Sequence, residues 1–490
     1  MILRACLWLM VLGLVAGWVY PAAASYKDDV GYTQLQNELG GALPTGAGVI
    51  VTQVEAGENH DPLNYQPNTS NSQFVGKSFY FPLGLGNVSS HATTVGTIFY
   101  GLTSSMSPGV PTIASYTAGN WLGSGFLATG FTVQPGYDNS RVGNHSYIGS
   151  ATTSEVLRRL DWVIGRDDFI HVVGMNNGAT NYPVLGSSFN AVAVGVSNGN
   201  HAIGSYALDA TYTAGRTRPD LVAPMTVTSD ATPLVASAAN LLVGFGHDNG
   251  ASLSRDPVQN STTNRIGNTI YNSERSETVK AALLAGASRS AISAYTVNAA
   301  NGMDQRYGAG QLNIYSSYHI IAAGEYNSLE DQPGHLGLIQ RYGFDYDPNF
   351  GGTSGSNRTA TYAFSTGNQT GSLRAGLVWN LAVDGGTPQI FDGTAILYDL
   401  NLYLYDWTDP SHPLVASSAS TLDNTENLWL STLLANRDYR LIVQAMGSDF
   451  QWDYGLAWEI TSAAPLPGAG PLLALGLAAL AGRGLWRRRP

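Results

Sequence analysis

The sequence predicts an α/β fold, a subtilisin-like mostly parallel sheet with helices on both faces, followed by a C-terminal antiparallel β-sandwich. Up to about residue 324, short apolar runs bounded by glycine alternate with amphipathic helical patterns, which is typical of a parallel sheet buried on both faces. From about residue 327 onward, side chains alternate with a period of two between loops rich in Gly, Ser, Asn and Asp. With 490 residues, the chain is also too long for one average domain.

In the first part, four segments support the parallel sheet and its helices. "GVIVTQV" (48–54), "FIHVVGM" (169–175) and "FNAVAVGV" (189–196) are short apolar runs, as expected of buried strands. "TSEVLRRLDWVIG" (153–165) places apolar residues on one helical face, and Ser154, near its start, is a plausible N-cap. The polar stretch 246–272 is expected to form a mobile surface loop.

In the second part, three segments alternate with the period of a strand. They are "SLRAGLVWN" (372–380), "LNLYLYD" (400–406) and "DYRLIVQA" (438–445), and together they favour a β-sandwich. The acidic stretches 345–349 and 423–427 contain oxygen ligands that could hold calcium, although we expect solvated turns there.

Composition excludes several classes of function. Charged residues make up only 12% of the chain, about half the usual fraction of a soluble domain. The formal net charge is −11, which disfavours binding to nucleic acid. The sole cysteine, Cys6, lies in the N-terminal leader, so the sequence offers neither a disulfide framework nor a cysteine metal site.

Both ends of the chain have the pattern of sorting signals. Residues 1–24 combine an early arginine, an apolar run and three alanines, which is typical of a secretory signal peptide. Residues 463–490 read Pro-Leu-Pro, then a short Leu/Ala/Gly run, then three arginines, and resemble a PEP-CTERM sorting tail. That resemblance implies an exosortase-type processing partner, transient membrane association, and export to the surface or matrix of a Gram-negative-type bacterium; a plain membrane anchor is the alternative. The domains expected between these ends are 25–325 and 326–462.

Four residues of the first part stand where a parallel-sheet enzyme presents its chemistry. Glu55 follows an apolar strand, on the edge where open α/β sheets bind ligands. His91 precedes a run of small residues that could open a helix, and Asn176 follows the strand 169–175. Ser229 precedes Pro233, which is at home in a first helical turn, so Ser229 is expected near a helix N-terminus. A serine needs an imidazole base, the imidazole needs a carboxylate, and an amide can stabilise the oxyanion.

In the order in which these motifs occur, the stretch 32–324 resembles the subtilisin-like serine peptidases. "GVIVTQVEAG", "SHATTVGT", "MNNG" and "VTSDATPLVAS" are similar to that family's acid, histidine, oxyanion and nucleophile segments. The resemblance implies a serine endopeptidase that needs no cofactor and no catalytic metal. It implies catalytic roles for Glu55, His91 and Ser229, and an oxyanion role for Asn176. "GNHSYIG" resembles the strand that pairs with a peptide substrate, and the matching residues are Ser146, Tyr147, Ile148 and Gly149.

The sequence also departs from that family's pattern. Glu55 stands where the family has Asp, and Val227 and Asp230 replace the usual neighbours of the nucleophile. These departures motivate a second hypothesis, a catalytically silent scaffold that serves as a surface or matrix binding protein, and a third, an esterase with the same triad. Asn177 is an alternative to Asn176 as the oxyanion amide, and Asp230 is expected to be a favourable carboxylate at a helix N-terminus.

Overall fold

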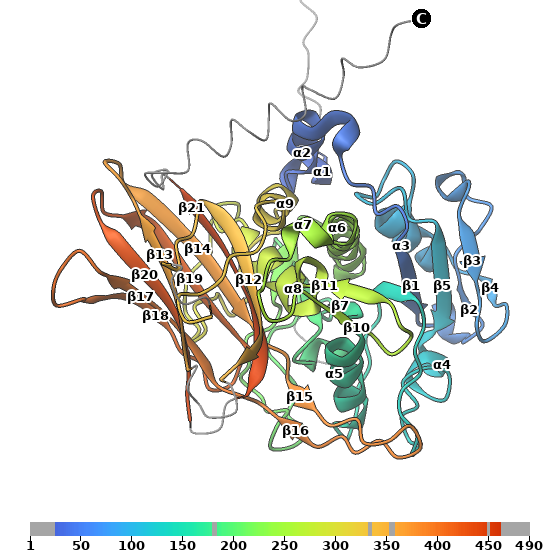
Figure 1. Cartoon of the computed structure of the whole chain (residues 1–490). Coiled ribbons are helices and arrows are strands. Elements are labelled where there is room, and N and C mark those ends of the chain that lie inside the picture. The colour runs from blue at the N-terminus through green and yellow to red at the C-terminus, as the bar shows by residue number, and fades with distance from the viewer. Residues whose placement is uncertain (1–24, 179–183, 332–335, 352–357, 448–450, 462–490) are drawn as a thin grey trace, which may run out of the picture.

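The computed structural model describes residues 25–178, 184–331, 336–351, 358–447 and 451–461 (Figure 1). The predicted signal peptide, 1–24, and the predicted sorting tail, 463–490, lie outside these residues. Within the described residues, no helix is long and apolar enough to cross a membrane.

A seven-stranded parallel sheet forms the first part of the molecule. Its order is β3-β5-β1-β6-β7-β8-β9, and every neighbouring pair runs parallel. In chain order its strands are β1 (Ile50–Glu55), β3 (Ser78–Tyr80), β5 (Thr112–Thr117), β6 (Ser140–His145), β7 (Ile170–Gly174), β8 (Val192–Val196) and β9 (Leu221–Ala223). The three apolar runs predicted to be buried strands are β1, β7 and β8.

Helices cover both faces of this sheet. In β7, Ile170 and Val172 join the apolar cluster that contains α3, α6, α8 and α9, whereas Val173 joins the cluster under α4 and α5 on the opposite face. The α-helices are α1 (Tyr26–Asp29), α2 (Tyr32–Leu39), α3 (Ser90–Tyr100), α4 (Ala118–Leu122), α5 (Glu155–Asp167), α6 (Thr228–Asp248), α7 (Gly250–Leu253), α8 (Ser276–Gly286) and α9 (Ile314–Ala322). Because successive residues of a strand point to opposite faces, burial on both sides explains the nearly continuous apolar runs.

Shorter elements complete the first part. Single 3₁₀ turns span Gly40–Ala42, Glu58–His60, Ser72–Phe74, Leu185–Ser187 and Asn272–Glu274. Two small sheets pair β2 (Asn64–Gln66) with β4 (Asn87–Val88), and β10 (Ser261–Thr263) with β11 (Thr269–Tyr271).

Two four-stranded antiparallel sheets form the β-sandwich. Their orders are β12-β21-β14-β19 and β13-β20-β17-β18, and a third cluster of apolar side chains fills the space between them. The strands are β12 (Tyr342–Phe350), β13 (Thr359–Ser365), β14 (Gly371–Val378), β15 (Ala382–Val383), β16 (Ala395–Ile396), β17 (Leu400–Asp406), β18 (Leu414–Ser418), β19 (Thr425–Leu433), β20 (Asp438–Ala445) and β21 (Trp452–Thr461). The three predicted alternating segments contribute β14, β17 and β20, so the predicted fold class is confirmed.

The sandwich packs against α8, which lies between it and the parallel sheet (Figure 1). Phe344, Val378 and Ala457 of the sandwich belong to the same apolar cluster as α8. Hydrogen bonds also join the sandwich to the first part of the molecule. The Asn380 side chain donates to the Ser276 hydroxyl at 3.0 Å, and the backbone amide of Leu381 donates to the side-chain oxygen of Asn190 at 2.7 Å.

The expectations for three segments, 246–272, 345–349 and 423–427, are wrong. The stretch 246–272 contains α7, β10 and β11 instead of being a loop throughout. Asp345 and Asp347 lie in β12 and are almost fully buried, so they are not part of a solvated turn. In the other acidic stretch, Asp423 and Glu426 are buried too. Ser154 does occupy the N-cap position of α5, but its side chain bonds Asp209 and does not cap the helix.

Candidate active site

Glu55 is the last residue of β1, and its carboxylate is buried and held in place. The side chain is 1% exposed. Its Oε1 accepts a hydrogen bond from Gln53 Nε2 at 2.8 Å, and the side-chain oxygen of Gln53, Oε1, in turn accepts one from the Tyr100 hydroxyl. Gln53 also donates to the carbonyl of Ala92 in α3 at 2.8 Å, so one buried amide joins the strand that carries Glu55 to α3.

His91 lies in the first turn of α3, against this carboxylate. Its Nδ1 is 2.9 Å from Glu55 Oε2, and 41% of its side chain is exposed. The helix begins here because the side chain of Ser89 caps it, accepting from the Ala92 amide at 3.0 Å. With Nδ1–H donated to Glu55, the other ring nitrogen, Nε2, can act as a base.

The electrostatics of the pair follow from its burial. The hydrogen bond to Glu55 raises the pKa of His91 above its ordinary value, more than the burial of the ring lowers it. Burial raises the pKa of Glu55, and the bonds from His91 and Gln53 oppose that shift. The carboxylate therefore favours the protonated imidazole, which is the charge that a general base acquires when it takes up a proton.

Ser229 lies in the first turn of α6, as predicted, but Pro233 is not in that turn. Because α6 begins at Thr228, Pro233 is inside the helix. A proline has no N–H to donate to the carbonyl four residues before it, which here is that of Ser229. The Ser146 hydroxyl donates to this carbonyl at 3.0 Å. The segment after β6 is therefore bonded directly to the turn that carries Ser229.

Asn176 and Asn177 follow β7 and have different surroundings. The side-chain oxygen of Asn177 accepts from the Thr228 amide at 2.9 Å and from the Thr228 hydroxyl at 3.0 Å, so it holds the start of α6. Asn176 is partly buried, and its carbonyl accepts from the Ala202 amide at 2.9 Å. Asn177 thus already has a structural role that sequence reasoning did not assign.

Two adjoining cavities bring most of the predicted residues together. A cavity of ≈ 140 Å³ is lined by His91, Asn176 and Ser229, together with Ser146, Tyr147 and Ile148. A second, of ≈ 380 Å³, shares His91 and the segment 146–148 and continues to Glu58. Because β1, β6 and β7 are neighbours in the sheet, Glu55, Ser146 and Asn176 at their carboxyl ends lie at one edge, and α3 and α6 bring His91 and Ser229 to the same edge. Gly149 does not line either cavity; its carbonyl accepts from the Val184 amide.

Two acidic side chains near His91 complete the site. Glu58 accepts from the amide and the hydroxyl of Ser90, at 2.8 and 2.6 Å, and these bonds lower its pKa to about 2. Asp230 lies in the first turn of α6, as expected, and its charge interacts with that of His91. Glu58 was not predicted; its position three residues after Glu55 was the available signal.

A buried histidine pair lies beneath the segment 146–148. His145 Nε2 is 2.8 Å from His171 Nδ1, and His145 Nδ1 is 3.3 Å from the Tyr147 hydroxyl. Burial lowers the pKa of His145 to about 3 and that of His171 well below its ordinary value. Burial therefore favours the neutral form of both rings, and His145 contacts Tyr147 of the cavity-lining segment.

The described residues contain no group of three or more His, Cys, Asp or Glu side chains arranged to hold a metal ion. The groups that a serine hydrolase needs, namely an acid, an imidazole, a hydroxyl and an amide, nevertheless gather at one edge of the parallel sheet.

Among solved structures, the chain resembles subtilisin-like serine proteases. A mutant of the protease domain of PatA is 14% identical, covers 58% of this chain and 98% of its own, and has a TM-score of 0.38. The PatG macrocyclase in complex with peptide is 14% identical, with coverages of 59% and 95% and a TM-score of 0.38. A cold-adapted subtilisin-like serine proteinase is 16% identical, with coverages of 55% and 89% and a TM-score of 0.31.

No protein-family model and no curated protein matches the sequence.

Proposed function

We propose that this protein is an exported serine endopeptidase of the subtilisin type, which hydrolyses peptide bonds with a Ser229-His91-Glu55 triad. The observation that supports it most directly is the 2.9 Å contact between a buried Glu55 carboxylate and His91 Nδ1, with His91 and Ser229 lining one cavity. A carboxylate that is 1% exposed and bonded to an imidazole at the rim of a cavity fits the orienting acid of a triad.

In this mechanism, His91 Nε2 takes the proton from the Ser229 hydroxyl as the oxygen attacks the peptide carbonyl. Glu55 holds the ring with Nδ1 protonated and stabilises the imidazolium that forms. The proton then passes from His91 to the leaving amine. Water next attacks the acyl-enzyme with the same help from His91, which releases the acid product and restores Ser229. Each step is a proton transfer or an acyl transfer between these side chains, the peptide and water.

The oxyanion forms beside the N-terminus of α6, where backbone amides and the helix dipole favour negative charge. Asn176 and Asn177 both line the cavity, and we assign the side-chain donor to Asn176, because the side-chain oxygen of Asn177 already holds Thr228 at the start of α6. One such donor contributes about 2.7–4 kcal/mol in subtilisin.

The segment that follows β6 is proposed to align the substrate. Ser146, Tyr147 and Ile148 line both cavities, and Gly149 continues the segment. An extended peptide laid against this segment would add a strand, with the carbonyl to be attacked near Ser229. The bond from Ser146 to the Ser229 carbonyl fixes the distance between the segment and the nucleophile.

A fluorophosphonate probe and a peptide substrate test this proposal. We expect the purified protein to be labelled on Ser229 and to hydrolyse casein, and Ser229→Ala to lose both activities. Ser70→Ala, an exposed serine outside the site, is the matched control and should retain both. Folded protein without label would support the silent binding scaffold, and turnover of esters without cleavage of peptides would support the esterase.

Export and sorting remain proposals, because residues 1–24 and 463–490 lie outside the described part of the chain. We propose that the signal peptide is removed and that an exosortase-type enzyme processes the tail after transient membrane association. Fractionation of the producing cells and sequencing of both ends of the mature protein test this. Intact residues 1–24 or 463–490 in the mature protein would contradict it.

A further inference from the structure

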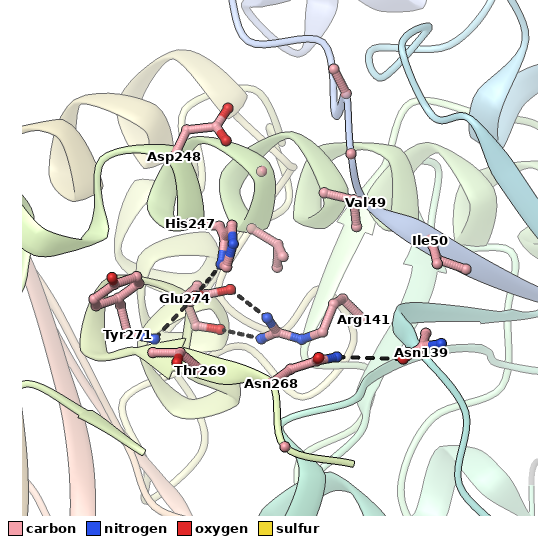
Figure 2. Close-up of a pocket in the computed structure, with 15 residues that line it drawn as sticks. Val49, Ile50, Asn139, Arg141, His247, Asp248, Asn268, Thr269, Tyr271 and Glu274 are labelled. Atoms are coloured by element: carbon pink, nitrogen blue, oxygen red, sulfur yellow. Dashed lines mark hydrogen bonds and ion pairs between the residues drawn. The ribbon is translucent and has the colours of Figure 1, made fainter. Parts of the chain in front are cut away.

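A third cavity, larger than the two at the candidate active site, lies at the opposite edge of the parallel sheet, where the strands begin. It has a volume of ≈ 760 Å³, within the range of about 300–1,000 Å³ that is typical of small-molecule sites. Its walls come from the amino ends of β1 and β6, the carboxyl end of α6, and the β10–β11 hairpin (Figure 2). Ser229 and His247 lie near opposite ends of α6, 18 residues or about 27 Å apart, so this cavity is separate from the candidate active site.

The hairpin that closes the cavity is held firmly to the rest of the protein. Arg265, in the turn between β10 and β11, binds both carboxylate oxygens of Asp167 and donates to the carbonyl of Pro135 at 2.8 Å. Its guanidinium also lies 4.3 Å from the centre of the Trp162 ring. A bidentate ion pair combined with a cation–π contact is one of the stronger surface attachments. The hairpin wall of the cavity is therefore anchored to the rest of the protein.

A buried charged group forms the floor of the cavity. Arg141 of β6 forms an ion pair with Glu274 through Nη1 and donates to the Glu274 carbonyl at 3.1 Å, while Glu274 is fully buried. The other carboxylate oxygen of Glu274 accepts from the Tyr271 amide at 3.0 Å and lies 2.8 Å from His247 Nδ1. Figure 2 shows Glu274 between Arg141 and His247. The imidazole is thus fixed through Nδ1, while 54% of the side chain is exposed at the cavity.

The buried charges in the floor of the cavity cancel each other. Arg141 forms an ion pair with Glu274, and His247 contacts the same carboxylate, so the guanidinium in the lining is already paired. A charged ligand would lose water on entry, while the buried charges that it meets in the floor are already bonded to each other. An uncharged ligand avoids that cost.

The two walls differ in polarity. One is formed by Ala47, Gly48, Val49, Ile50, Val243 and Gly244. The other presents the amides of Asn139 and Asn268, 3.5 Å apart, with His247 and Tyr271. A side-chain amide offers a donor and an acceptor side by side. This suits neighbouring hydroxyl groups, each of which can both donate and accept a hydrogen bond. A sugar ring, with apolar C–H faces and a hydroxylated edge, matches an apolar wall opposite a polar one.

We propose that this cavity binds an uncharged saccharide, with the ring against the apolar wall and its hydroxyls toward Asn139, Asn268 and His247. This site is independent of the proposed peptidase activity, because none of its lining residues belongs to the triad or its cavities.

Binding of defined sugars to the full protein tests the proposal. Glucose, galactose, N-acetylglucosamine, maltose and cellobiose serve as neutral probes, and glucuronate and glucosamine as charged ones. Saturation-transfer NMR and calorimetry measure the binding. We expect at least one neutral probe to bind with a dissociation constant of about 1 mM or lower, and the charged analogues to bind about ten-fold more weakly.

Variants locate the site without touching the catalytic residues. Asn268→Ala is expected to weaken binding about ten-fold, and Thr269→Trp, at an exposed position on the cavity wall, should abolish it by filling the space. Asn37→Ala, an exposed asparagine on α2, is the control and should leave binding unchanged. Peptide hydrolysis should persist in all three variants.

Three results would overturn the proposal. The first is that no neutral probe binds at about 10 mM, ten times the expected constant. The second is that glucuronate or glucosamine binds more tightly than every neutral probe. The third is that binding survives both Asn268→Ala and Thr269→Trp, which would place it elsewhere on the protein.

Discussion

Shortening the acidic side chain at position 55 is the most direct test of the triad. Glu55→Asp keeps the charge but shortens the side chain by one C–C bond, about 1.5 Å. β1 is bonded to β5 and β6 along its length, so its backbone cannot follow the shortened side chain toward α3. The 2.9 Å contact to His91 Nδ1 would then open to roughly 4 Å, beyond hydrogen-bonding distance.

The expected loss can be worked from this geometry. Breaking a buried ion pair by displacing one partner costs about 3–5 kcal/mol. His91 becomes charged only as Ser229 loses its proton, so we expect that cost in the transition state. At 1.36 kcal/mol per factor of ten, kcat/KM should fall by about 10² to 10⁴. Ser229 labelling by a fluorophosphonate should slow in parallel.

The pH profile supplies a second readout. The bond to Glu55 is the main cause that raises the pKa of His91, and the base must be neutral to act. Weakening that bond lowers the pKa, so the rising limb of kcat/KM should move to lower pH in Glu55→Asp. Glu55→Gln removes the charge and should move the limb in the same direction.

The assay is peptide hydrolysis between pH 5 and pH 9, with circular dichroism to show that each variant is folded. Glu38→Asp is the matched control, since Glu38 also faces a histidine, His319 at 3.2 Å, but lies in α2 and lines neither cavity of the site. If Glu55→Asp retained the wild-type kcat/KM and pH profile, the reach of Glu55 would not matter, and the triad as described would be wrong.

Three further predictions concern other parts of the structure. Asn176→Ala should lower kcat by about 10² to 10³ with little change in KM. Asn177→Ala should mainly lower the free energy of unfolding, by about 0.5–2 kcal/mol, because it frees the start of α6. Equal kinetic losses in both variants would contradict our assignment of the oxyanion donor. Burial raises the pKa of Asp345 well above its usual value, so the folded state binds more protons than the unfolded one and loses stability as pH rises above about 4. Asp345→Asn should therefore gain in Tm relative to wild type between pH 5 and pH 8; a calcium-dependent rise in the Tm of the wild type alone would instead favour the calcium site that the sequence left open. Leu441→Ala, in the core of the sandwich, should lower the free energy of unfolding by about 2–5 kcal/mol in denaturant titrations, and the exposed Leu414→Ala by less than about 0.5 kcal/mol.

Local patterns predicted the fold and the neighbourhood of the candidate site well. A buried parallel strand needs apolar residues on both faces, so β1, β7 and β8 are visible as apolar runs. The polar residue after each such strand lies at the carboxyl edge, and this rule alone brings Glu55 and Asn176 to one end of the sheet.

Interactions between distant segments were not predictable in the same way. Nothing near Gln53 in the sequence indicates that its amide joins Glu55 to Tyr100 and Ala92 of α3. The ion pair of Arg141 with Glu274 joins residues 133 positions apart, and both look like ordinary surface residues in the sequence. Buried polar groups must find partners, but the sequence does not say which partners.

The junction between the sandwich and α8 limits where the chain can be truncated or its C-terminal part replaced. A protein truncated before the sandwich would expose the part of α8 that now contacts Val378 and Ala457, and would leave Asn190 without Leu381. Grafting another C-terminal module in its place would require the same apolar surface and the same two-way bonding to Asn190. The two parts are thus better treated as one structural unit than as interchangeable modules.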